Sequence, residues 1–121
     1  MKMTNLSEKY LILNHSKEER DKTRVAGVAY RMEDDGCFLL RLRILPVIRY
    51  YLVQQKNDPQ RFLIFSGMSK VSGKCRFFYQ IGEGSFSYRA DVIELKFPDL
   101  NQTYYMQIDG REDQPNSNAA A

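Results

Sequence analysis

Apolar and polar residues alternate along the middle of the chain, and residues typical of turns interrupt this alternation at short intervals. The alternation is clearest over residues 37–45. One face of this stretch holds Phe38, Leu40, Leu42 and Ile44, and the other holds Arg41 and Arg43. A period of two is typical of a β-strand with one buried face. The sequence therefore predicts a strand here, with its aliphatic face inside and its arginines outside.

The same pattern predicts further strands over residues 25–32, 47–56, 61–68, 75–81, 86–97 and 103–108. In the first of these, one face holds Ala26, Val28, Tyr30 and Met32. Because the aliphatic phase of 86–97 slips near Asp91, we predict a bulge there. Pro46 has no backbone donor and is expected at a strand boundary or bulge.

Turn residues divide these strands. We predict hairpin turns at 33–36 and at 82–85, a turn at 57–60 and a loop at 69–74, because Gly, Asp, Asn and Pro favour turn geometry. The predicted fold is mainly β: an antiparallel meander or small barrel of about six to seven strands, with at most a short N-terminal helix.

The two ends of the chain differ from its middle. Residues 1–24 form a polar, charged leader around Tyr10–Leu13, which the pattern leaves open as strand or helix. Residues 16–19 have the spacing of a capping box, so a short helix or a charged linker follows. We expect a single β-domain over residues 25–110 and a disordered tail over 111–121. Because no signal-peptide core or membrane-spanning run is seen, we expect a cytoplasmic protein.

Charge is distributed unevenly along the chain. The 121 residues carry a net charge of +3, but residues 41–96 hold ten basic and four acidic side chains, a net charge of +6. A cationic middle is typical of a surface that binds polyanions, and also of β-sheet edges that use Lys and Arg against aggregation. The sequence leaves both readings open.

Residues suited to catalysis or metal binding are few. The single His15 lies in the charged leader, and Cys37 and Cys75 have no second ligand at the spacing of a zinc site. Asp34-Asp35 precedes a glycine and is typical of a turn. We therefore expect a protein that is not an enzyme, with no metal and no cofactor, and with both cysteines as buried thiols.

Aromatic residues beside arginine are the strongest indication of binding. The chain has eight Tyr and seven Phe but no Trp, and several of these rings adjoin an arginine. Rings and cations together bind single-stranded nucleic acid, although β-proteins also use them as cross-strand pairs. The candidate binding residues are Arg41, Arg43, Arg49, Tyr51, Arg76, Tyr88 and Arg89, with Tyr51 and Tyr88 as the stacking rings.

Two functions remain open at this point. The leading hypothesis is a non-enzymatic adaptor or inhibitor that presents a β-sheet surface to a protein partner, in a mobile element or a secretion machine. The alternative is a small barrel that binds nucleic acid with its basic and aromatic face. Because residues 61–65 and 75–81 are apolar enough to need cover on both faces, self-association as a dimer is favoured. We expect no membrane partner.

One further observation concerns the order of elements. Its marks are Asp35-Gly36, Leu40-Arg41-Leu42, Arg61-Phe62 with Gly67, and Leu95-Lys96-Phe97-Pro98-Asp99. Over about residues 26–110 this order resembles a family of small uncharacterised proteins encoded on bacterial plasmids and conjugative elements. The family's Ala-Ala-Trp is absent here, where Cys75–Tyr79 stands. The resemblance implies a bacterial mobile-element accessory protein and assigns no functional residues.

Overall fold

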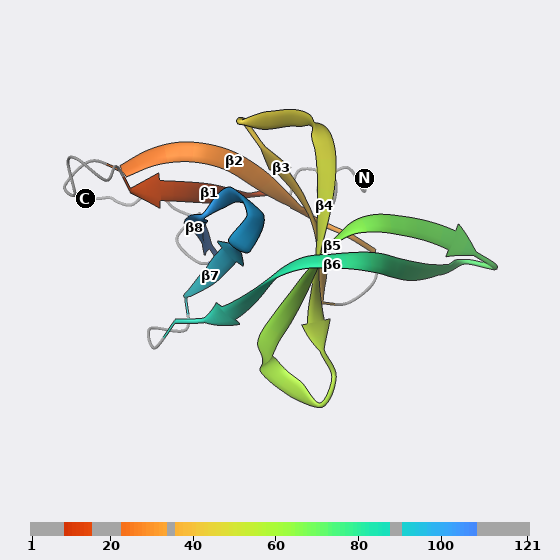
Figure 1. The fold of residues 1–121 in the computed structure, drawn as a ribbon. Helices are drawn as coiled ribbons and strands as arrows, with labels where there is room; N and C mark the ends of the chain where they lie inside the picture. Colours follow the sequence, from red (N-terminus) through yellow and green to blue (C-terminus); the bar gives the residue numbers. More distant parts are fainter. Residues whose placement is uncertain (1–8, 16–22, 34–35, 88–90, 109–121) are drawn as a thin grey trace, which may run out of the picture.

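Eight β-strands follow one another and close into an antiparallel barrel (Figure 1). The computed structural model describes residues 9–15, 23–33, 36–87 and 91–108. The strands are β1 (Lys9–His15), β2 (Thr23–Arg31), β3 (Cys37–Leu42), β4 (Leu45–Gln55), β5 (Asp58–Val71), β6 (Lys74–Phe86), β7 (Val92–Phe97) and β8 (Gln102–Gln107). A 3-10 turn, η1 (Pro98–Leu100), joins β7 to β8. The prediction of a mainly antiparallel β fold is confirmed, with eight strands in place of six to seven.

The segment around Tyr10–Leu13 supplies the additional strand and closes the barrel. It forms β1, which pairs with β2 along its length and with β8 through Ile12 opposite Met106 and Leu13 opposite Tyr105. The barrel therefore begins at Lys9, inside the segment that the sequence reading treated as a leader. The helix or linker predicted after Ser16 and the tail over 111–121 lie outside the described residues.

The core consists of the inward-facing residues of all eight strands except the long outer part of β5 and β6. Its fully buried members include Ile12, Ala29, Leu40, Leu42, Leu52, Ile64, Ile93, Leu95 and Met106. Phe97 packs edge-on against Tyr50 at 5.3 Å and against Tyr104 at 5.6 Å, measured between ring centroids. Burial raises the pKa of Tyr50, and the nearby Asp99 carboxylate raises it further. Burial, followed by the charge of Tyr50, raises the pKa of Tyr104.

The larger side chains on the face that the sequence predicts for residues 25–32 lie outside the core. Ala29 is fully buried, whereas Val28 and Tyr30 are half-buried and line a pocket outside the core. Val28 lies opposite the exposed Arg41, and residues directly opposite in a ladder share a face. The small residues Gly27 and Ala29 face inward, and β2 runs close to β3 at Gly27. A Cβ on Gly27 would lie 2.2 Å from the Arg41 carbonyl oxygen.

The β3–β4 connection also differs from the prediction at one position. Leu40 and Leu42 are in the core as predicted, but Ile44 lies in the turn and is 64% exposed. The ladder then shifts register, because Leu42 pairs with Leu45 while Leu40 pairs with Tyr50. Pro46 lies in the extra residues of this irregular stretch, so its predicted place at a boundary or bulge is confirmed.

Three predictions about irregular segments need correction or refinement. Residues 82–85, predicted as a hairpin turn, lie inside β6 and pair with β5 and β7. The slip near Asp91 is not a bulge within one strand but the connection between β6 and β7, where the Ser87 N–H donates to the Val92 carbonyl oxygen at 2.8 Å. The loop expected at 69–74 is a two-residue turn, Ser72–Gly73, with φ of 54° and 79°. Positive φ at both central residues is typical of turns that match strand twist.

Candidate functional site

The outer half of the β5–β6 hairpin extends beyond the barrel (Figure 1). We call residues 66–80 the arm. Strand β4 pairs with β5 only as far as Tyr51 opposite Phe65, and β7 pairs with β6 only from Glu83 onward. Within the described residues the two strands of the arm therefore pair only with each other. Both of their outer edges offer backbone N–H and C=O groups that can pair with another strand.

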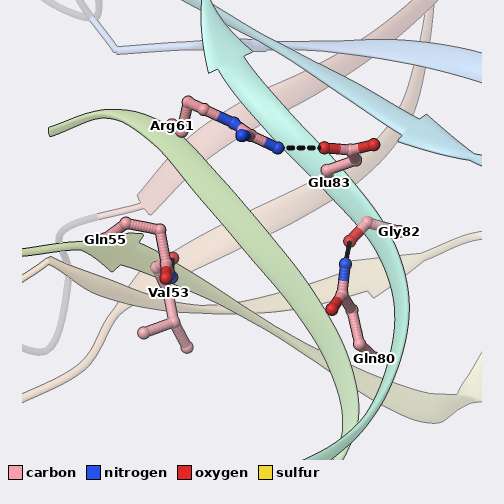
Figure 2. Close-up of polar contacts among 6 residues, drawn as sticks. All are labelled: Val53, Gln55, Arg61, Gln80, Gly82 and Glu83. Carbon is pink, nitrogen blue, oxygen red and sulfur yellow. Dashed lines mark hydrogen bonds and ion pairs between the residues drawn. The ribbon is translucent and has the colours of Figure 1, made fainter. Parts of the chain in front are cut away.

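Side-chain contacts join β5 to β6 on the barrel side of the arm, and further contacts join the arm to β4. Arg61 on β5 and Glu83 on β6 point toward each other and form an ion pair of 2.6 Å between Nη2 and Oε1 (Figure 2). Phe77 lies 5.8 Å from both Phe65 and Tyr51, measured between ring centroids, and is nearly parallel to Phe65. This cluster explains why a two-stranded ribbon, which is marginal alone in water, has a defined direction here.

The arm exposes large apolar side chains. Tyr79 is 75% exposed, Val71 53% and Phe78 40%. The Phe78 ring packs over Gly67, where a Cβ would lie 2.6 Å from it, and contacts Tyr79 edge-on at 5.8 Å. Exposed rings beside one another are characteristic of interfaces, where aromatic anchors carry much of the binding energy.

The backbone of Tyr79 is in the left-handed region, with φ of 64°. Residues with a Cβ rarely adopt this conformation unless the surrounding structure imposes it. Here the β5–β6 register shifts between Ile64 and Phe65, so β6 has one extra residue close to Tyr79. The Tyr79 ring is 75% exposed, and its Cδ2 atom would lie 3.1 Å from a Cβ placed on Gly67 of the neighbouring strand.

The arm is also basic. Lys70, Lys74 and Arg76 are exposed, and the Lys70 ammonium lies 3.9 Å from the Glu33 carboxylate. An ion pair of that length between exposed groups is weak. Charge on this surface would therefore favour an acidic partner.

A second apolar projection lies at the β3–β4 hairpin. Its exposed residues are Ile44, Val47 at 89% and Ile48 at 36%. These side chains are aliphatic and lie in a turn and an irregular stretch of strand, whereas the arm presents two adjacent rings on a two-stranded ribbon. The arm is the better-defined surface of the two.

Three arginines surround two adjoining pockets beside this hairpin. One pocket, of about 310 Å³, has Arg41 and Arg43 in its wall, and the other, of about 340 Å³, has Arg24 and Arg43. The Arg41 guanidinium donates to the Pro46 carbonyl oxygen at 3.1 Å, which fixes its position at the edge of the first pocket.

The structure separates the binding residues predicted from the sequence. Arg41, Arg43 and Arg49 are exposed at the β3–β4 end, and Arg76 is exposed on the arm. Tyr51 faces outward but is only 9% exposed, because Phe77 covers it. Tyr88 and Arg89 lie outside the described residues. Phe78 and Tyr79 are the exposed rings instead. The run Arg76-Phe77-Phe78-Tyr79 was a sequence signal for them, since adjacent strand residues face opposite ways.

Groups suited to metal binding do not gather in the described part of the chain, where no three His, Cys, Asp or Glu side chains come together. Cys37 is buried and Cys75 is half-buried, both as thiols. His15 is the last residue of β1. Among the described residues, no helix has the length and apolar character needed to cross a membrane.

Comparison of the chain with protein-family models, with curated proteins and with solved structures finds no match. The resemblance to plasmid-encoded proteins therefore stays a prediction.

Proposed function

We propose that this protein is a non-enzymatic adaptor or inhibitor that binds a protein partner with its β5–β6 arm. The observation that carries the proposal is the exposure of Phe78 and Tyr79 on a ribbon whose outer edges are unpaired in the described structure. Rings supply anchors for a partner's pockets, and strand edges supply backbone hydrogen bonds. The closed barrel supports the arm and itself has few open edges.

The second candidate is nucleic-acid binding. Exposure of Arg24, Arg41 and Arg43 around two pockets favours it. Burial of Tyr51 argues against its predicted role as a stacking ring, because the Tyr51 ring can stack on a base only if Phe77 moves away. The two functions differ in salt dependence, since each phosphate contact releases counterions and a desolvated aromatic anchor does not.

The sharpest test of the arm is the Tyr79→Asn variant. Asparagine accepts positive φ more readily than tyrosine, so the variant removes the ring without adding backbone strain. Its circular dichroism spectrum and unfolding midpoint should match or exceed those of the wild type. Val47→Thr is the matched control, because it also replaces an exposed apolar side chain but on the other projection.

The experiment compares proteins captured from the native host by wild-type, Tyr79→Asn and Val47→Thr protein, followed by affinity measurement on those that differ. A partner of the arm should bind wild type and Val47→Thr alike and lose about 30-fold in affinity with Tyr79→Asn, the effect of one aromatic anchor. Equal binding by wild type and Tyr79→Asn would contradict the proposal. Light scattering on the same proteins shows whether the partner is a second copy of this chain.

Fluorescence anisotropy with labelled single- and double-stranded oligonucleotides, at two salt concentrations, tests the second candidate. Nucleic-acid binding should weaken steeply with salt, and the double variant Arg41→Gln/Arg43→Gln should lower the salt slope by about two phosphate contacts. Absence of binding at low salt would remove this candidate.

A further inference from the structure

The two adjoining pockets at the β2–β3 end of the barrel form a continuous site. Val25 and Arg43 line both pockets, so they form the ridge between them. On one side of the ridge the pocket lies over the outer face of β2 and β3, and on the other it reaches toward the end of the barrel beside Tyr104. This site is separate from the arm.

The walls of the first pocket are mostly apolar. Val25, Val28, Leu42 and Pro46 contribute aliphatic surface, and Tyr30 contributes a half-buried ring. Leu42 is otherwise a core residue, so the pocket reaches down to the barrel wall. Binding an apolar group of a ligand against this surface removes apolar area from water, which stabilises the complex.

The charged groups around the site are all cationic. Arg43 lies on the shared ridge, with Arg41 in the first pocket and Arg24 in the second, and none of the described residues that line either pocket is acidic. Guanidinium groups present several donors in a plane, which matches the oxygens of a carboxylate or a phosphate. Three such groups around one site favour a negatively charged occupant.

Parts of the site are held in place by hydrogen bonds. The Arg41 guanidinium donates to the Pro46 carbonyl oxygen at 3.1 Å. In the second pocket, the Asn14 side-chain amide donates to Gln102 Oε1 and to the Thr103 carbonyl oxygen, both at 3.1 Å. A site fixed in this way loses less side-chain entropy when a ligand binds.

We propose that this site binds a small organic anion in which a carboxylate or phosphate head is joined to an apolar body. The head lies against Arg43, between Arg41 and Arg24, and the body lies between Val28 and Pro46. The pocket volumes, about 310 and 340 Å³, suit a small molecule. A nucleic-acid strand would also need exposed rings on which its bases stack, whereas Tyr30 is half-buried and Tyr104 is buried.

The test is a titration of the full chain with octanoate and octyl phosphate, followed through backbone amide chemical shifts in two-dimensional NMR spectra. The two ligands share a body and separate carboxylate from phosphate heads. Octanol, which lacks the charge, and inorganic phosphate, which lacks the body, are the matched controls. We expect saturable shifts at Val25, Gly27, Val28 and Arg43 with at least one of the two anions, and weaker binding of both controls.

Variants test the role of the arginines. Arg43→Gln should weaken binding about three- to fivefold, and Arg41→Gln/Arg43→Gln about tenfold, as expected for exposed charge pairs. Arg43 lies in an exposed turn, so its single variant is available even where the double variant folds poorly. Lys56→Gln removes the same charge in the turn at the opposite end of β4 and should leave binding unchanged.

Several outcomes would overturn the proposal: no saturable shift at the pockets, shifts confined to the arm, or equal binding of octanol and octanoate. Binding of inorganic phosphate as tight as that of octyl phosphate would also overturn it, because the apolar walls would then contribute nothing. An oligonucleotide that binds through Arg41 and Arg43 while both small anions fail would assign this surface to nucleic acid instead.

Discussion

Gly82 lies where the backbone of β6 passes close to that of β7, and an alanine there tests the strand pairing on this side of the barrel. A Cβ at this position would lie 2.4 Å from the Lys96 carbonyl oxygen, whereas ordinary contact begins at 3.4 Å. The backbone of β7 therefore has to move by roughly 1 Å, because the atom in the way is not a flexible side chain. The pairs next to it, Glu83 with Lys96 and Gly84 with Leu95, would be strained first.

The expected loss for Gly82→Ala is about 3 kcal/mol in the free energy of unfolding. Overpacking contributes about 2 kcal/mol. Two weakened ladder hydrogen bonds contribute about 2 kcal/mol together. Alanine also lowers the conformational entropy of the unfolded chain relative to glycine, which offsets about 1 kcal/mol of the expected destabilisation. Urea unfolding followed by circular dichroism, with tyrosine fluorescence as a second probe, measures the change.

Two other glycines calibrate the result. Gly84→Ala should cost about 1 kcal/mol, because its nearest atoms lie at 3.2–3.3 Å and neighbours can adjust. Gly73→Ala meets no atom within 4 Å but has φ of +79°, so about 1 kcal/mol of backbone strain is expected. If Gly82→Ala proves no more destabilising than these two, β6 does not approach β7 as described, and the explanation for the glycine is refuted.

Three further predictions concern the buried tyrosines, the arm and the ion pair between Arg61 and Glu83. Burial raises the pKa of Tyr50 and Tyr104 above the unfolded value of 10.0. The stability that the folded state gains from keeping these two phenols protonated is therefore fully present below about pH 10, and it is lost as the pH rises through the folded pKa values. Absorbance titration near 295 nm should show that Tyr50 and Tyr104 ionise at higher pH than the other tyrosines, and Tyr104→Phe should reduce the loss of stability at alkaline pH. Simultaneous titration of all tyrosines would contradict this. Phe77→Ala should speed amide hydrogen exchange in residues 66–80 while the barrel keeps its protection; uniform acceleration would show that the arm is part of the core. Arg61→Gln should cost less than about 1 kcal/mol and lose its effect at high salt, because both partners of its ion pair with Glu83 are about half exposed; a larger, salt-independent loss in urea unfolding would contradict that reasoning.

Glycine shows why turns were harder to place than strands. Gly82 and Gly84 have the spacing of a hairpin turn, and the sequence reading placed one there. Both lie inside β6, where the Lys96 carbonyl or the Leu95 side chain leaves little room for a Cβ. A turn and a close approach of two strands both require glycine, so the local sequence does not distinguish them. The neighbouring strand, which is distant in sequence, decides.

In the candidate binding surfaces, too, the local sequence predicted some features and distant segments decided others. Arg41, Arg43, Arg49 and Arg76 are exposed as the sequence reading required, because charged side chains remain in water in almost any fold. Rings are different, since an outward ring can still be covered by another segment. Tyr51 is covered by Phe77 from the arm, while Tyr79 of the arm is 75% exposed.

By itself, the sequence determined the β class of this protein, the inward faces of its best strands and the cationic character of its middle. Alternation with a period of two is a local property, and it placed Leu40, Leu42 and Phe38 against the core. Tertiary structure decided the closure of the barrel through β1 and β8, the projection of the arm, and the placement of Arg24, Arg41 and Arg43 around two adjoining pockets. Each of these depends on contacts between segments far apart in the chain, and the geometry of those contacts is set by strand register and twist rather than by any local pattern.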